Sequence, residues 1–224
     1  MSAPLALVAG AGPGLGQALV AHFAAHGYTA VGLNRSVPDG ADDTLAVDLT
    51  DSADTAQLVA ALTETHGAPA LVVHNPAKLV IADFEQTSPA DFESTWRAMV
   101  LSAVHLAHAV LPPMVAAGSG TLIVSGATAS LRGGARFAAF ASAKAGLRGL
   151  SQSLAREYGP AGVHVAHVIL DGIIDTPASR ALHSLDPDRM MRPVDIADSY
   201  LALAAQPPST WTHELDLRPR GETF

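Results

Sequence analysis

The stretch Leu5–Gly16, LALVAGAGPGLG, joins an apolar run to a cluster of glycines and stands directly before a helical pattern. The run has the length and composition of a buried strand. A strand that turns through glycines into a helix directs the free N–H groups and the positive end of the helix dipole at one point, which suits a phosphate or pyrophosphate. A Cβ would block this turn or the close approach of the backbone. The glycines concerned are Gly10, Gly12, Gly14 and Gly16.

The composition limits the class of protein. The chain has 224 residues, 49% of them hydrophobic and 15% charged, which suits one well-packed globular domain over residues 1–224. A net charge of −8 without any run of Lys or Arg argues against nucleic acid or an anionic membrane surface as partner. The N-terminal apolar run is too short to span a bilayer and no basic segment precedes it, so we expect a soluble, cytoplasmic protein.

Short apolar runs alternate with helical patterns along the whole chain. The predicted strands lie at 5–9, 29–33, 44–47, 70–74, 121–124, 163–170 and 211–217. The predicted helices lie at 15–26, 52–65, 88–111, 137–158 and 194–205, and Pro112-Pro113 is expected to mark the end of the third. The alternation predicts an α/β fold in which helices cover both faces of a doubly wound parallel sheet of about seven strands.

Metal ligands are also considered, because the chain has ten histidines and no cysteine. His164 and His167 lie three residues apart on a predicted strand and therefore face opposite sides of it. A metal shared by this pair is disfavoured, and we expect no structural metal.

Several motifs stand at the predicted strand ends, where open α/β sheets bind ligands. Gly10-x-x-x-Gly14-x-Gly16 follows the first strand, and Phe140-x-x-x-Lys144 opens a long helix. With Asp48-Leu49 and His74–Ala77, they resemble the motifs of the short-chain dehydrogenase/reductase family over nearly the whole chain. The resemblance implies a Rossmann fold, a nicotinamide dinucleotide cofactor, a small-molecule substrate and a homo-oligomer, either a dimer or a tetramer. The cofactor-binding residues that it implies are Gly10, Gly12, Pro13, Gly14, Leu15, Gly16, Asn34, Arg35, Asp48, Leu49, Asn75, Lys144 and Thr176.

The residues after the second predicted strand bear on the choice of cofactor. A carboxylate there would bond the ribose hydroxyls of NAD and repel a 2′-phosphate, but the chain has Asn34 and Arg35. An amide followed by a guanidinium suits a phosphate, which favours NADP(H) over NAD(H). The alternative is that Arg35 is a solvated loop charge.

At three of the four catalytic positions that the resemblance implies, the chain has a residue that cannot donate or accept a proton. The family's Lys falls on Lys144, but its Tyr falls on Phe140, its Ser on Ala127 and its Asn on Met99. Ser125 and Thr128 flank Ala127, and a shift in register would put either hydroxyl in the Ser role.

Phe140 cannot donate a proton, so two interpretations compete. In the first, the protein is an oxidoreductase whose proton comes from elsewhere, with Asp171 as the first candidate because it stands beside the expected nicotinamide. Asp171 is equally well explained as a loop cap. An iminium ion or an activated alkene, which needs little protonation, would also fit this interpretation. In the second, the fold binds NADP(H) without hydride transfer, as a sensor or scaffold. A non-redox isomerase or lyase in the same cleft is a weaker third possibility.

Overall fold

A parallel sheet forms the centre of the computed structural model, which describes residues 3–222. The seven strands follow the order β3-β2-β1-β4-β5-β6-β7, and every neighbouring pair is parallel. The order reverses between β1 and β4, which is the doubly wound arrangement expected from the alternating pattern. The strands are β1 (Leu5–Ala9), β2 (Thr29–Asn34), β3 (Thr44–Ala46), β4 (Leu71–His74), β5 (Gly120–Ser125), β6 (Val163–Leu170) and β7 (Glu214–Leu217).

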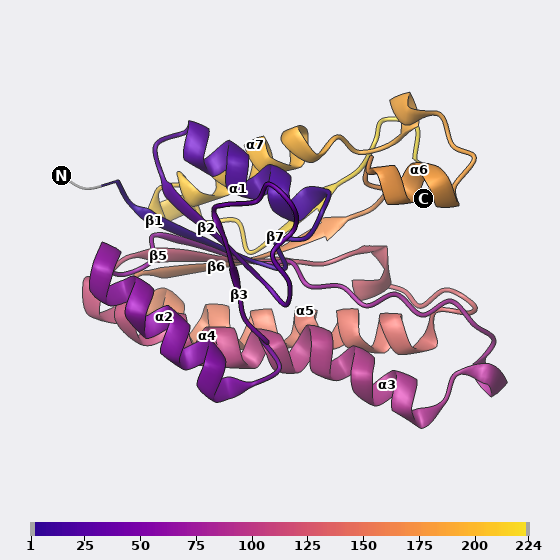
Figure 1. Cartoon of the computed structure of the whole chain (residues 1–224), viewed down its shortest axis with the longest axis horizontal. Coiled ribbons are helices and arrows are strands. Elements are labelled where there is room, and N and C mark those ends of the chain that lie inside the picture. Colours follow the sequence, from indigo (N-terminus) through magenta and orange to yellow (C-terminus); the bar gives the residue numbers. More distant parts are fainter. Residues whose placement is uncertain (1–2, 223–224) are drawn as a thin grey trace.

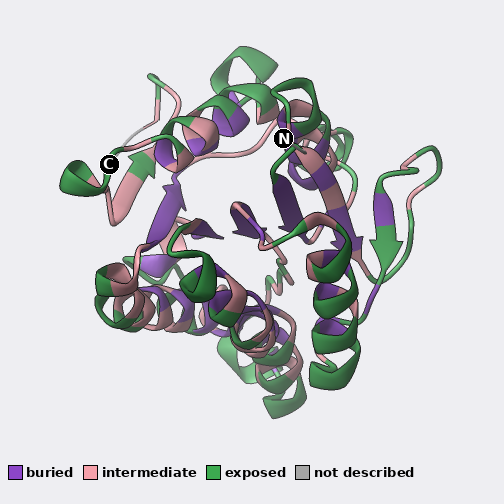
Figure 2. Cartoon of the chain, turned by 90° about the vertical axis from the view of Figure 1, so that its left-hand side faces the viewer, coloured by how far each residue is buried: buried purple, intermediate pink, exposed green. Residues whose placement is uncertain are grey.

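Two layers of helices cover the sheet, and Figures 1 and 2 show the buried strands between them. One face carries α1 (Leu15–Ala25) and α7 (Pro193–Ala204), and the other carries α2 (Ser52–His66), α4 (Ser102–Ala117) and α5 (Ala138–Tyr158). Alternate residues of β1 serve the two cores: Leu5 and Leu7 pack with α2, α4 and α5, whereas Ala6 and Val8 pack with α1 and α7. Burial on both faces explains why the strand is continuously apolar.

Local chemistry sets where the helices begin. Ser88 caps α3 (Pro89–Trp96) by accepting from the Asp91 N–H, and the Asp91 carboxylate accepts from the Ser88 N–H in return. Asp51 caps α2 by accepting from the N–H groups of Ala53 and Asp54. Both starts agree with the predicted boundaries.

The prediction that Pro112-Pro113 marks the end of the third helix is wrong. α4 continues through both prolines to Ala117 and ends at Gly118, which has a left-handed φ of 67°. Pro112 is exposed and Pro113 partly so, hence the carbonyls that lose their helical donors lie on the side where water replaces them. The physical stop is therefore the glycine.

The predicted C-terminal strand is also shorter than expected. β7 begins at Glu214 rather than at residue 211. The Trp211 ring stacks on His164 with centroids 5.0 Å apart, and the Thr212 N–H donates to the Gln206 side chain at 2.7 Å. These contacts hold Trp211 and Thr212 outside the sheet.

α3, a π-helical turn at Arg97–Leu101, and α4 run together as one helical segment, Pro89–Ala117. By length and composition alone this segment is apolar enough to cross a membrane. Half of its most apolar stretch is buried inside the fold, and Leu106 and Val110 belong to the core against the sheet. The segment is thus accounted for as a core helix.

Candidate active site

The glycine turn between β1 and α1 has the geometry that the sequence predicts. Gly10 and Gly14 have φ values of +82° and +110°, which side chains rarely adopt. A Cβ on Gly16 would lie 2.3 Å from the Gly10 carbonyl oxygen, so only glycine allows the turn to close. No side chain caps the start of α1. The N–H groups of Gln17 and Ala18 donate to the carbonyls of Gly12 and Gly14, at 3.1 Å each, so those of Leu15 and Gly16 remain for a ligand at this helix start.

A cleft of about 520 Å³ opens at the carboxyl ends of β1, β2 and β4. It brings together seven of the residues implied by the resemblance: Gly10, Gly12, Asn34, Arg35, Asp48, Leu49 and Asn75. The other six, Pro13, Gly14, Leu15, Gly16, Lys144 and Thr176, do not line it. Gly14 instead lies against Thr176, since a Cβ there would be 2.7 Å from the Thr176 methyl carbon, and Thr176 caps the short helix α6 (Pro177–Leu182).

Asp48 lies in this cleft as an ionised carboxylate. The Thr50 N–H and Oγ1 both donate to its Oδ1, at 2.9 and 2.8 Å, and these bonds hold the pKa of Asp48 below its ordinary value. The guanidinium groups of Arg35 and Arg97 lower it further by their charge. Arg97 and Lys78 also line the cleft, and sequence analysis did not select either. Arg97 lies two residues before Met99, in a segment that the sequence analysis identified as a helix from its apolar residues alone.

Lys144 and Phe140 lie one turn apart on α5, as their spacing predicts. The Lys144 side chain is buried, and its Nζ donates to the Ser125 carbonyl at 2.7 Å. Nζ lies 5.7 Å from the centre of the Phe140 ring. Burial lowers the pKa of Lys144 to about 8. The ammonium has two further N–H donors for a ligand beyond the carbonyl bond.

The residues that follow β5 and β6 meet in a small polar cluster. Thr128 Oγ1 donates to Asp171 Oδ1, and the Arg218 guanidinium approaches Asp171 Oδ2 at 3.4 Å. The Asp171 side chain thus accepts from a hydroxyl and faces a guanidinium, and its role as a proton donor stays a prediction. Of the two hydroxyls beside Ala127, Thr128 remains at the site, because Ser125 Oγ bonds the buried Tyr200 hydroxyl at 2.8 Å.

A buried hydrogen-bonded chain holds the turn that carries Ala127 and Thr128. His167 on β6 bonds Glu214 Oε2 through Nδ1 at 3.2 Å and Ser130 Oγ through Nε2 at 3.2 Å. Ser130 Oγ in turn accepts from the Ala127 N–H at 3.2 Å. Sequence analysis treated His167 only as a metal candidate, because pairing between strands is invisible in the chain itself.

Gly126 is expected to tolerate no side chain, because an added Cβ would lie 2.3 Å from His167 Nε2. The ring cannot move aside, since it is fully buried and bonded at both nitrogens. We expect Gly126→Ala to reduce the free energy of unfolding by about 1–3 kcal/mol, measured by urea denaturation. Gly149→Ala is the matched control: Gly149 lies on α5 with open space around it, so this change should stabilise by up to about 1 kcal/mol. Equal effects of the two substitutions would contradict the argument.

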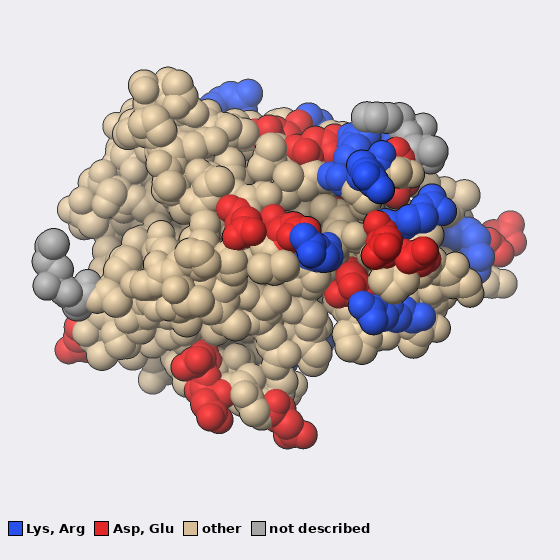
Figure 3. All heavy atoms as spheres, turned by 90° about the horizontal axis from the view of Figure 1, so that it is seen from above, with Lys and Arg blue, Asp and Glu red and all other residues tan. Residues whose placement is uncertain are grey.

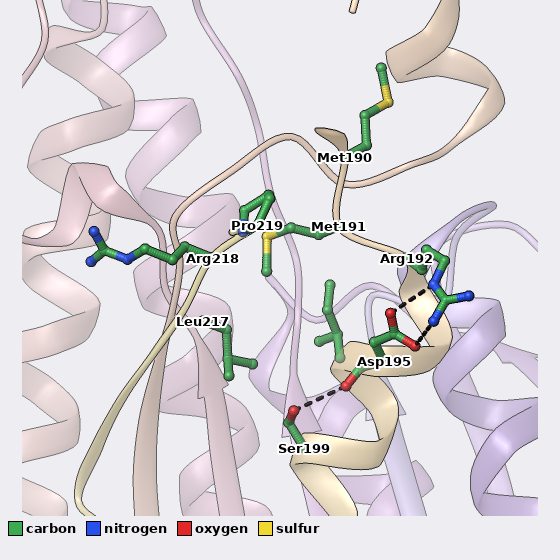
Figure 4. Close-up of a pocket in the computed structure, with 9 residues that line it drawn as sticks. Met190, Met191, Arg192, Asp195, Ser199, Leu217, Arg218 and Pro219 are labelled. Atoms are coloured by element: carbon green, nitrogen blue, oxygen red, sulfur yellow. Dashed lines mark hydrogen bonds and ion pairs between the residues drawn. The ribbon is translucent and has the colours of Figure 1, made fainter. Parts of the chain in front are cut away.

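A second pocket, of about 180 Å³, lies between the start of α7 and the end of β7 (Figure 4). Arg192 forms a bidentate ion pair with the Asp195 carboxylate, at 2.7 and 2.8 Å, and Ser199 Oγ donates to the Asp195 backbone carbonyl at 3.0 Å. These groups already satisfy one another, so the pocket offers less to a ligand than the larger cleft. Within residues 3–222 no three His, Asp or Glu side chains gather as metal ligands would.

Comparison with known proteins agrees with this geometry. The family model for short chain dehydrogenase matches residues 4–186. A solved short-chain dehydrogenase from Rhodopseudomonas palustris is 32% identical, with a TM-score of 0.80 over 96% of this chain and 98% of that one. The fold is that of the short-chain dehydrogenases, which are a class of oxidoreductases. The chain belongs to the short-chain dehydrogenase family.

Two other relatives are more distant in sequence. A metagenomic short-chain oxidoreductase, solved in complex with NADP, is 26% identical with a TM-score of 0.83 and 98% coverage of both chains. The 3-oxoacyl-acyl-carrier-protein reductase FabG of Escherichia coli (strain K12) is 29% identical over 187 residues, which are 80% of this chain and 76% of that one.

Proposed function

We propose that the protein is an NADP(H)-dependent oxidoreductase that acts on a small organic carbonyl, imine or activated alkene. The observation that carries this proposal is the cleft at the strand edge, where the glycine turn, Arg35 and Asp48 face one space. The cleft also fits the cofactor sterically. Gly12 lines it, and a Cβ there would meet no protein atom within 4 Å, so a side chain would project into the space that the dinucleotide needs.

Three groups of the protein would each bind a different part of the cofactor. The uncapped N–H groups at the start of α1 would hold the diphosphate, Arg35 the 2′-phosphate, and Lys144 the ribose beside the nicotinamide. The cofactor, when bound, supplies the hydride for reduction or accepts it in oxidation. Reduction of a carbonyl also requires a proton, which the cofactor does not supply.

The proton route that we propose is the Thr128–Asp171 pair. Thr128 Oγ1 gives its own hydrogen to Asp171, so its lone pairs are free to accept from a substrate hydroxyl. In alcohol oxidation the substrate proton would pass to Thr128 Oγ1 while the Thr128 proton passes to Asp171 Oδ1. In carbonyl reduction both transfers run in reverse, starting from protonated Asp171.

Titration with NADPH, followed by fluorescence, tests the cofactor, and turnover of aldehydes, ketones, imines and enones tests the chemistry. Tight binding with no turnover of any of these substrates would favour a sensor or scaffold, for which the lack of a proton donor at Phe140 is the supporting observation. Failure to bind either NADPH or NADH would reject both functions.

Arg35→Ala is expected to raise the Kd for NADPH about tenfold and to change the Kd for NADH less than about twofold, because only NADPH presents a phosphate to the guanidinium. Arg156→Ala serves as the control, since it removes the same charge from the exposed face of α5. An equal loss of affinity for both dinucleotides in Arg35→Ala would reverse the choice of cofactor.

We also propose that the protein acts in the cytoplasm as a homo-oligomer, a dimer or tetramer. Trp96 supports an interface on the α3 and α5 side, because it is 45% exposed and lies beside Gly146 of α5. Light scattering at several concentrations tests this state, and a monomer at all of them would contradict it.

A further inference from the structure

Arg97 reaches the cofactor cleft from a different side than Arg35 does. Arg35 follows β2, whereas Arg97 opens the π-helical turn after α3, and both line the same cleft. Both guanidinium groups act on the Asp48 carboxylate by their charge. Ala98 and Ser102, further along the helical segment, line the cleft as well, so this part of the segment forms one wall of it.

The charges in the cleft do not balance. Two guanidinium groups share one carboxylate, and Thr50 already occupies Oδ1 of Asp48. Within residues 3–222, neither Arg35 nor Arg97 has a hydrogen-bond partner among the side chains that face them. Lys78 adds a further cation to the lining, although it bonds Ser94 Oγ at 2.6 Å and lies near Asp91. The cleft is thus locally cationic in a protein of net charge −8.

The wider surface does not repeat this pattern. Seen from above, basic side chains gather toward one end of the molecule and are interspersed with acidic ones (Figure 3). Elsewhere in the chain, Arg180 forms an ion pair with Asp175 and Arg192 with Asp195. Arg97 differs from these residues because its guanidinium shares its carboxylate neighbour with a second arginine. A group with more than one negative charge would satisfy both arginines, and a phosphomonoester carries about −1.5 to −2 at neutral pH.

We infer that Arg97 is the second guanidinium of a two-sided clamp, which it forms with Arg35, for a phosphomonoester on the 2′ oxygen of the adenine ribose. The clamp rests on the proposed function and deepens it: the cleft recognises a phosphorylated ribose from two walls rather than from the β2 loop alone. A guanidinium fork matches two phosphate oxygens, so two forks can share the three oxygens of one phosphomonoester.

The test uses the whole protein and four probes: NADPH, NADH, adenosine 2′,5′-bisphosphate and AMP. Arg97→Ala is expected to raise the Kd values for NADPH and the bisphosphate about tenfold and to change those for NADH and AMP less than about twofold, measured by calorimetry. Arg97→Lys keeps the charge but loses the fork, so it should restore only part of the affinity. Arg156→Ala, with the same change in net charge away from the cleft, should leave all four Kd values unchanged.

The outcomes separate this inference from the proposed function. If the wild type binds NADPH tightly and Arg97→Ala binds it equally well, the clamp is wrong and the function stands. If Arg97→Ala weakens the binding of NADH and AMP as much as that of the two 2′-phosphorylated probes, Arg97 does not recognise the 2′-phosphate. In the Arg35→Ala, Arg97→Ala double variant, a loss that differs from the product of the single losses supports one shared phosphate, whereas independent effects overturn it. A wild type that binds no dinucleotide rejects the proposed function itself.

Discussion

Replacement of Phe140 with tyrosine is expected to raise kcat/KM for ketone reduction with NADPH about 100-fold, which is the usual scale of general acid catalysis. The Phe140 ring already lies 5.7 Å from the Lys144 ammonium, so a hydroxyl on that ring would stand beside a buried cation that favours its ionised form. The measurement is the initial rate of NADPH consumption across a series of ketones and aldehydes.

Phe140→Leu is the control, because it alters the same position without adding a proton donor. It should bring no gain, and NADPH should bind all three proteins with similar Kd values. If Phe140→Tyr folds and binds NADPH but reduces no carbonyl faster, the missing proton donor is not what limits the reaction.

The same variant also tests the proton route through Thr128 and Asp171. Asp171→Asn should lower turnover about 100-fold in the wild type, because the amide cannot accept or return the proton. In the Phe140→Tyr background it should cost much less, since the new hydroxyl takes over the transfer. Equal losses in both backgrounds would assign Asp171 to positioning the turn rather than to proton transfer.

The second large effect is expected on acidification, where the fold should lose stability steeply between pH 6.5 and pH 4. Burial lowers the pKa of His74 from 6.5 to about 3 and that of His167 from 6.5 to about 4. The folded protein therefore keeps both rings neutral while the unfolded chain binds protons below about pH 6.5. Their stabilisation is complete above that pH and is lost as the pH falls, by about 3 kcal/mol for each ring at pH 4.

Urea denaturation at pH 7, 6, 5 and 4 measures this loss. His74→Leu should reduce the pH dependence of the free energy of unfolding by about one proton, because the ring that binds it is gone. Ser102, which loses the imidazole as a partner, keeps its hydrogen bond to the Ala98 carbonyl at 2.7 Å. His108→Gln, on the exposed side of α4, is the matched control for the removal of one histidine. A slope in His74→Leu equal to that of the wild type would show that this ring is not the group that titrates.

Much of the fold was predictable because its signals are local. The apolar run Leu5–Ala9, the glycines that follow it and the Ser88 capping box each depend on neighbouring residues, and the structure confirms the elements that they predict. The carboxyl ends of parallel strands meet at one edge, so the sequence alone could assign Gly10, Asn34, Asp48 and Asn75 to one cleft. The end of α4 was missed, because the cost of a proline depends on whether water reaches the freed carbonyls, and exposure is a property of the folded chain.

By itself, the sequence determined the doubly wound sheet, the position of the glycine turn and the one-turn spacing of Phe140 and Lys144, because each follows from periodicity or from contacts a few residues apart. Only the tertiary structure decided which distant side chains meet. It gave Asp171 the partners Thr128 and Arg218, linked His167 to Ser130 and Glu214, and brought Arg97 to the cleft of Arg35. The physical reason is that such pairings depend on strand order and helix packing, which place residues as far apart in the chain as Arg35 and Arg97, 62 positions, around one space.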